Sequence, residues 1–194
     1  MNQNKVPIAL SNRHLHISRE HLDILFGKGY ELHKMKDLKQ PGQYAADEQV
    51  DLAGPKGTIK GVRVLGPVRN KTQIEISFAD SFVLGIKPPV RDSGDLEDSA
   101  GVTIVGPKGE VELNEGVIAA ARHIHMTPSD AEKWNLKDKD TVNVRTGGDR
   151  SIIFENVLVR VNKDYALEMH VDMEEGNGAG VKNNDEVELV LNQN

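Results

Sequence analysis

Hydrophobic and polar residues alternate along this chain in short runs, and turn residues separate the runs. Alternation with a period of two places apolar side chains on one face of a β-strand. The pattern predicts a buried strand over 6–17 and six further strands, at residues 49–52, 61–65, 73–78, 102–105, 151–161 and 166–171. Many short strands with few helices favour two small β-barrels or sandwiches over a helical bundle.

Two stretches nearly repeat each other, Arg13–Ser18 (RHLHIS) and Arg122–Thr127 (RHIHMT), and they contain four of the seven histidines. In a strand, both histidines of each stretch point to one face while the apolar residues point to the other. Each stretch ends in a residue that commonly caps a helix, which predicts short helices at 19–26 and from 128 to about 135. The shared order of strand, histidine pair and helix makes duplication the simplest explanation.

Other short stretches echo one another in the same way. Gly-Pro-Lys-Gly occurs at 54–57 and again at 106–109, which predicts two hairpin turns. Residues 136–144 and 181–189 share a polar turn that leads into an alternating strand. We interpret these echoes as further parts of the duplication.

We expect a mainly β chain of two pseudo-repeated β-barrel domains capped by short α-helices. The first domain would cover 6–115 and the second 116–191, each with one histidine pair; the boundary is approximate, and strands can be exchanged between the barrels. Residues 85–101 lack clear periodicity and contain two prolines, which indicates the connection between the domains. Arg91 in this segment belongs either to a solvated linker or to a site.

Composition narrows the chemistry. The 194 residues are 38% hydrophobic but only 4% aromatic, so the core should consist of Val, Ile and Leu. The net charge of −6 argues against a general nucleic-acid binder, and no apolar run approaches the roughly 18 residues that a membrane-spanning helix needs. Because the chain has no cysteine, any metal must be held by histidine and carboxylate.

Each histidine pair places two imidazoles side by side, an arrangement that can chelate a divalent metal. Zinc typically takes four ligands, so a third protein ligand is expected for each pair. Glu75 and His170 lie in predicted strands, but spacing alone leaves each open between a ligand and an ordinary strand-surface residue. Arg69 follows a turn, where its guanidinium either binds a phosphate or is a solvated surface charge. His21 and His33 are interpreted as helix-surface and loop residues.

The chain contains four longer motifs: NRHLHIS (12–18), GPVRNKTQIE (66–75), PVRDSGD (89–95) and GVIAAARHIHM (116–126). With these motifs the chain resembles the phosphate propanoyltransferases, a family of phosphotransacylases, over about residues 6–191. The resemblance implies transfer of a propanoyl or acetyl group between coenzyme A and inorganic phosphate, in propanediol degradation or related acetate pathways. In that reaction acyl-CoA and phosphate give acyl phosphate and coenzyme A.

The resemblance also implies a site: a dinuclear zinc centre between two β-barrels, with two zinc ions per chain and coenzyme A nearby. The ligands of the first zinc would be His14, His16 and Glu75, and those of the second would be His123, His125 and His170. The first zinc would take the coenzyme A sulfur, and water or phosphate would complete the second. Arg69 would bind phosphate and take part in catalysis. The residues near coenzyme A would be Lys36, Arg63 and Asn177.

Acyl transfer to phosphate needs a positioned nucleophile and a stabilised thiolate leaving group. Because the chain has no cysteine and no serine in a recognisable nucleophile elbow, we expect direct attack by phosphate and no acyl-enzyme. The alternatives are a zinc-dependent thioesterase or phosphoesterase, and a metal-binding module without turnover. A single methylene is worth only about 1 to 3 kcal/mol, so the choice between propanoyl and acetyl stays open.

The first residues contain no apolar segment of the kind found in secretion signals, and about five residues precede the first predicted strand. Some family members carry an N-terminal amphipathic segment that targets them to microcompartments. We therefore expect either a free cytoplasmic enzyme or a chain from which that segment has been removed. The resemblance also implies a homodimer. No nucleic-acid or membrane partner is expected.

Overall fold

The structure is a computed structural model that describes residues 4–191. Within these residues it contains fourteen strands and four helices. The strands are β1 (Lys5–Ser11), β2 (His14–Ser18), β3 (Lys34–Asp37), β4 (Tyr44–Ala53), β5 (Thr58–Arg69), β6 (Gln73–Glu75), β7 (Val90–Arg91), β8 (Ala100–Val105), β9 (Glu110–Ala120), β10 (His123–Met126), β11 (Thr141–Arg145), β12 (Ile153–Val161), β13 (Glu168–Asp172) and β14 (Glu186–Val190). The helices are α1 (Arg19–Phe26), α2 (Phe78–Leu84), α3 (Pro128–Lys133) and α4 (Met173–Ala179).

The first compact unit comprises Asn12–Ala120 and contains a closed six-stranded barrel. Its strands follow the order β4–β5–β2–β6–β9–β8, and β8 closes the circle because it pairs with both β9 and β4. Leu15 and Ile17 of β2 are fully buried in a core made mainly of Val, Ile and Leu, as the composition predicts. The strand period therefore turns His14 and His16 away from this core.

The second unit contains β1 and the chain from Ala121 onward. Its six strands close a barrel in the order β1–β13–β10–β12–β11–β14. A separate hydrophobic core fills it, in which Ile124 and Met126 of β10 are fully buried. The two closed barrels and the short helices confirm the predicted fold class.

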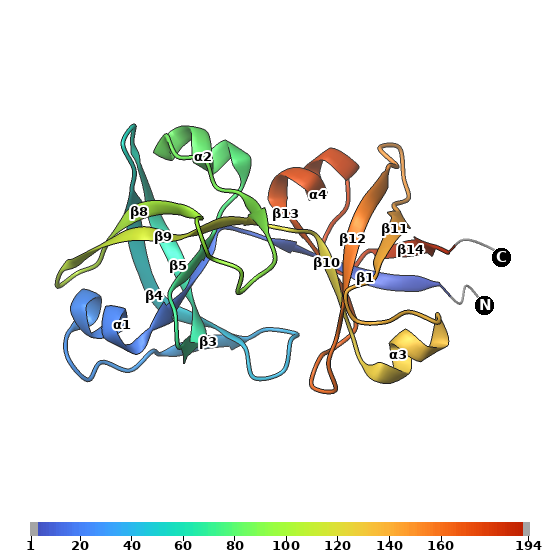
Figure 1. Ribbon diagram of the computed structural model, residues 1–194, viewed down its shortest axis with the longest axis horizontal. Coiled ribbons are helices and arrows are strands. Elements are labelled where there is room, and N and C mark those ends of the chain that lie inside the picture. The colour runs from blue at the N-terminus through green and yellow to red at the C-terminus, as the bar shows by residue number, and fades with distance from the viewer. Residues whose placement is uncertain (1–3, 192–194) are drawn as a thin grey trace. The chain divides into compact units, whose positions relative to one another are not determined.

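One supersecondary unit, a strand followed by a helix and two antiparallel strands, occurs four times in the described residues (Figure 1). Its copies are β2–α1–β4–β5, β6–α2–β8–β9, β10–α3–β11–β12 and β13–α4–β14–β1. In the first two copies a further short strand, β3 or β7, lies between the helix and the antiparallel pair. In every copy the first strand pairs in parallel with the last strand. Each barrel holds two copies, whose first strands are antiparallel neighbours. The fourth copy is completed by the N-terminal strand β1, so the duplication is circularly permuted along the chain.

The prediction of one strand over 6–17 is wrong. The chain forms two strands, β1 and β2, that Asn12 and Arg13 separate and that belong to different units. β1 pairs with β13 and β14. Apolar and polar residues alternate with the same period in both strands, so the pattern does not indicate which sheet each strand joins. The units consequently divide after Ser11 and after Ala120, which differs from the predicted domains 6–115 and 116–191.

The segment 85–101 lies inside the first unit, so its predicted role as the interdomain connection is wrong. β7, within this segment, pairs in parallel with β9. Arg91 donates a hydrogen bond to Asp95 at 3.2 Å, and Leu96 is buried. The segment lacks periodicity because it packs along the barrel through few strand pairs.

Both Gly-Pro-Lys-Gly turns are confirmed, and both lie in the first barrel, where they close the β4–β5 and β8–β9 hairpins. They therefore mark the repeat within this barrel and not the repeat between barrels. A Cβ on Gly54 would lie 2.2 Å from the carbonyl oxygen of Leu84, and one on Gly106 would lie 2.7 Å from that of Leu25. Only glycine lets each turn approach the end of a helix this closely.

The predicted helices α1 and α3 are confirmed, with their N-caps at Ser18 and Thr127. The sequence interpretation missed α2 and α4, although each begins with a capping box, at Ser77 and at Asp172. Among the described residues, none of the helices has the length and apolar character required to cross a bilayer.

Candidate active site

The first barrel gathers His14, His16 and Glu75 into one cluster. The ligand atoms of these three side chains all lie within 4.8 Å of one another. Strand pairing creates the cluster, because Glu75 of β6 is the Cα partner of His14 on β2. Nε2 of His14 lies 3.5 Å from Oε2 of Glu75.

The second barrel repeats this arrangement with His123, His125 and His170, whose ligand nitrogens also lie within 4.8 Å of one another. His170 of β13 is the Cα partner of His123 on β10, as Glu75 is of His14. The Nε2 atoms of His123 and His125 are 3.1 Å apart. The structure thus brings all six predicted metal ligands into two clusters of three.

The backbone fixes the first histidine of each pair. Nδ1 of His14 lies 2.9 Å from the carbonyl oxygen of Asn12, and Nδ1 of His123 lies 2.8 Å from that of Ala121. A carbonyl oxygen can only accept, so Nδ1 donates in both rings. The lone pair of each ring is then on Nε2, which faces its cluster.

The second histidine of each pair is held neutral. Burial, and then the neighbouring His14 imidazole, lowers the pKa of His16 to about 3. Burial, and then the neighbouring His123, lowers the pKa of His125 to about 2. Neutral imidazole is the form that binds a metal.

These donor sets fit zinc. Two ligands at 2.0–2.1 Å from a tetrahedral zinc ion are separated by roughly 3.4 Å, so donor atoms that already converge need only small adjustments to bind it. The first cluster offers two nitrogens and a carboxylate, and the second offers three nitrogens. Both sets leave a fourth position for a further ligand, as catalytic zinc sites do.

The arginine of each R-H-x-H motif pairs with the helix that follows the third ligand. Arg13 contacts Asp80 through two atom pairs, at 2.9 and 2.7 Å, and the Asp80 side chain is only 6% exposed. Arg122 makes a single contact of 3.2 Å with Glu175, whose pKa burial raises. Both acids are also the third residue of a capping box. Each arginine therefore ties the histidine strand to the helix that begins three residues beyond the third ligand.

An arginine also lies beside the second histidine of each pair. The charge of Arg69 contributes to the lowered pKa of His16, and that of Arg160 contributes in the same way at His125. Arg160 is the Cα partner of His125 on the neighbouring strand, so both side chains point to one face of the sheet. Each cluster therefore has a cation beside it that can attract an anion.

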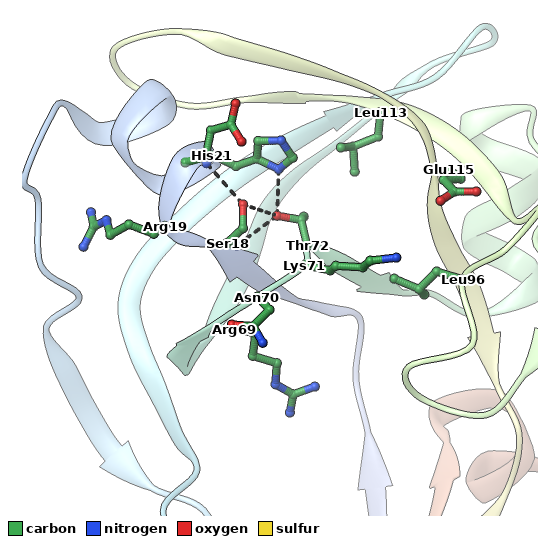
Figure 2. Close-up of a pocket in the computed structure, with 11 residues that line it drawn as sticks. Ser18, Arg19, His21, Arg69, Asn70, Lys71, Thr72, Leu96, Leu113 and Glu115 are labelled. Atoms are coloured by element: carbon green, nitrogen blue, oxygen red, sulfur yellow. Dashed lines mark hydrogen bonds between the residues drawn. The ribbon is translucent and has the colours of Figure 1, made fainter.

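A cavity of about 430 Å³ opens beside Arg69 in the first barrel. Figure 2 shows Ser18, His21 and Thr72 joined by hydrogen bonds. Arg69 is the last residue of β5, and Lys71 lies in the turn that follows it. His21 was interpreted as a helix-surface residue, yet its Nδ1 lies 2.8 Å from the Thr72 hydroxyl. Besides these cations and hydroxyl groups, the carboxylates of Glu20 and Glu115 line the cavity, so the charge of its lining is mixed.

The other predicted site residues are more scattered. Arg63 is half-buried opposite His14 and donates to the carbonyl oxygen of Ala46 at 2.6 Å. Lys36 lies exposed on β3, and Asn177 lies exposed in α4 of the second unit. Arg69 donates to Gln43 at 3.1 Å. The structure places none of these four in the clusters themselves.

Sequence reasoning missed four residues that surround the clusters. Gln73 and Glu168 contact the third ligands, and Arg160 and Tyr165 lie next to His125. The alternation could have identified Gln73 and Glu168, because each lies two residues before a predicted ligand and thus on the same strand face.

The fold and the clusters define a duplicated β-barrel protein in which each barrel carries one cluster of three side chains that could hold a metal ion. Comparison with known proteins gives the particular family. The sequence profile of the phosphate propanoyltransferases matches residues 7–182, and the chain belongs to this family. It is 57% identical to the phosphate propanoyltransferase of Thermotoga maritima, over 94% of this chain and 88% of the relative. It is 52% identical to that of Rhodopseudomonas palustris, over 95% and 82% of the two chains. The chain is therefore an acyltransferase.

Proposed function

We propose that this acyltransferase moves a short acyl group, propanoyl or acetyl, between coenzyme A and inorganic phosphate. The products of acyl-CoA and phosphate are acyl phosphate and free coenzyme A. One observation carries the proposal: the family profile spans residues 7–182, and all six cluster residues fall within this span. The relatives are named for propanoyl transfer to phosphate, which supplies the substrate class.

The proposal includes one zinc ion in each cluster. Convergent imidazole nitrogens and a carboxylate support it, because these are the donors that zinc takes in proteins without thiolates. When bound, zinc would act as a Lewis acid and accept the coenzyme A sulfur as a ligand. We assign the sulfur to the cluster of His14, His16 and Glu75, and phosphate to the cluster of His123, His125 and His170.

Arg69 is the proposed phosphate-binding side chain. Its guanidinium is a planar fork of N–H donors that matches two phosphate oxygens. It is half-buried beside the cavity and close enough to His16 to lower the pKa of that imidazole. Lys36, Arg63 and Asn177 are the proposed contacts to coenzyme A.

The proposed reaction is a direct displacement. A phosphate oxygen attacks the acyl carbonyl carbon, the new C–O bond forms, and the C–S bond breaks with its electron pair on the thiolate. The chain has no cysteine that could carry the acyl group between two steps. Steady-state kinetics should therefore show a ternary complex, and a trapped acyl adduct on the protein would contradict direct attack.

We further propose that the enzyme is a cytoplasmic homodimer. The family resemblance is the basis for the dimer, and sedimentation at several protein concentrations tests it. Fractionation of the native cell tests the location, and recovery of the protein inside microcompartments would contradict it.

The decisive experiment combines metal analysis with a coenzyme A release assay. Purified protein should contain two zinc ions per chain, and coenzyme A release from propanoyl-CoA should require phosphate and produce acyl phosphate. Release without phosphate would identify a thioesterase. Bound metal without release would identify a metal-binding module. Replacing both histidines of either pair by alanine should abolish turnover if the two ions serve one reaction.

A further inference from the structure

Two buried polar residues occupy the same position in their repeat copies and contact the third ligands. Gln73 lies two residues before Glu75 on β6, and Glu168 lies two residues before His170 on β13. In the other two copies, the first histidine of each pair takes this position. The duplication therefore provides four equivalent positions, of which two carry ligands and two carry neighbours of a ligand.

Gln73 uses its whole amide group. The side chain is 3% exposed, and its Nε2 donates to Oε1 of Glu75 and to the hydroxyl of Ser93, both at 2.7 Å. Its Oε1 accepts the backbone N–H of Gly94, also at 2.7 Å. These bonds fix the carboxylate of Glu75 in one orientation and attach it to the loop that contains Ser93.

Glu168 plays the corresponding part in the second barrel. It is 5% exposed, and its Oε2 lies 2.8 Å from Nε2 of His170. A carboxylate accepts this N–H, so the imidazole of His170 keeps its lone pair on Nδ1. Carboxylate partners of this kind orient metal-binding histidines in many proteins.

The two contacts are chemically matched to their ligands. The carboxylate ligand Glu75 receives an amide donor, whereas the imidazole ligand His170 receives a carboxylate acceptor. We propose that Gln73 and Glu168 are positioning residues, which hold the third ligand of each cluster ready for the metal. The inference rests on the proposed zinc binding, and it assigns roles to two residues that neither touch the metal nor react.

The test measures zinc affinity one cluster at a time. A background with His123 and His125 changed to alanine retains the first cluster, and one with His14 and His16 changed to alanine retains the second. Competition with a chromophoric chelator then gives the dissociation constant of zinc in each background. Gln73→Met and Glu168→Met are introduced into both backgrounds, so that every variant has the other cluster as its matched control.

We expect Gln73→Met to weaken zinc binding about 10- to 100-fold in the first cluster only, and Glu168→Met to do so in the second cluster only. Glu168→Gln should retain part of the affinity, because its amide oxygen still accepts from His170. Unchanged zinc affinity at the cluster that the substituted residue contacts, or equal losses of affinity at both clusters, would overturn the inference. Failure of both parent backgrounds to bind zinc would instead refute the proposed metal centre.

Ser93→Ala provides a second test that does not depend on folding of a Gln73 variant. This change removes one partner of the Gln73 amide and leaves β6 intact. We expect a smaller loss of affinity at the first cluster and none at the second. Folding of every variant is checked by circular dichroism without metal, and Ser93→Ala with wild-type affinity in a folded protein would count against the role of the amide network.

Discussion

The pairing of Arg13 with Asp80 should stabilise the first barrel more than the pairing of Arg122 with Glu175 stabilises the second. The first pair has two contacts, at 2.9 and 2.7 Å, to a carboxylate that is 6% exposed. Hydrogen bonds to charged groups contribute about 1.5–3 kcal/mol each, but the Arg13 side chain is 40% exposed, so we reduce the sum to about 2 kcal/mol. The second pair has one contact of 3.2 Å to a carboxylate that is 25% exposed, and it should contribute about 0.5 kcal/mol.

Double-mutant cycles measure these coupling energies. One cycle combines Arg13→Met with Asp80→Asn, and the other combines Arg122→Met with Glu175→Gln. A chain with two barrels need not unfold in one step. Native-state hydrogen exchange of the amides in β2 and β10 therefore reports the free energy of opening in each barrel, in metal-free protein.

We expect the first cycle to give a coupling energy about 1.5 kcal/mol larger than the second. Arg13→Lys should recover less than half of the coupling, because an ammonium group cannot match both carboxylate oxygens. Additive effects of Arg13→Met and Asp80→Asn, or equal coupling in the two cycles, would refute the argument from burial and geometry.

Three further predictions concern phosphate, packing and acid stability. In steady-state kinetics, Arg69→Met should raise the KM for phosphate at least about 10-fold, which corresponds to about 1.4 kcal/mol. The KM for acyl-CoA should stay nearly unchanged. An equal rise in both KM values would argue against a contact between Arg69 and phosphate. Gly54→Ala should destabilise the first barrel by about 1–3 kcal/mol in urea unfolding, because its Cβ would collide with the backbone of Leu84. The control Gly147→Ala places its Cβ in open space and should change stability by less than about 0.5 kcal/mol. Burial alone would raise the pKa of Glu48, but hydrogen bonds from His33, the backbone and Tyr30 outweigh burial and lower it. Ionised Glu48 therefore stabilises the fold above its unfolded-state pKa, and this stabilisation is lost as the pH falls through the lower folded-state pKa. Glu48→Gln should flatten the fall of the urea midpoint between pH 7 and 3. A fall as steep as that of the wild type would exclude Glu48 as a source of acid instability.

Local sequence determined the parts of the site that depend on neighbours along the chain. The histidine pairs share a strand face because side chains alternate with a period of two. The helices after Ser18 and Thr127 follow from the residues that cap them. The capping-box spacing of Ser77–Asp80 and of Asp172–Glu175 predicts α2 and α4 in the same way.

The tertiary structure alone decided which strands meet. Alternation over residues 6–17 could not show that β1 and β2 enter different barrels, because a period of two suits a strand of either barrel. Strand pairing likewise brings Glu75 to His14 and His170 to His123 across long sequence separations. Register between distant strands is set by the packing of both cores and not by either strand. The sequence by itself thus specified two histidine pairs on capped strands, and the closure of each barrel supplied the third side chain of each cluster.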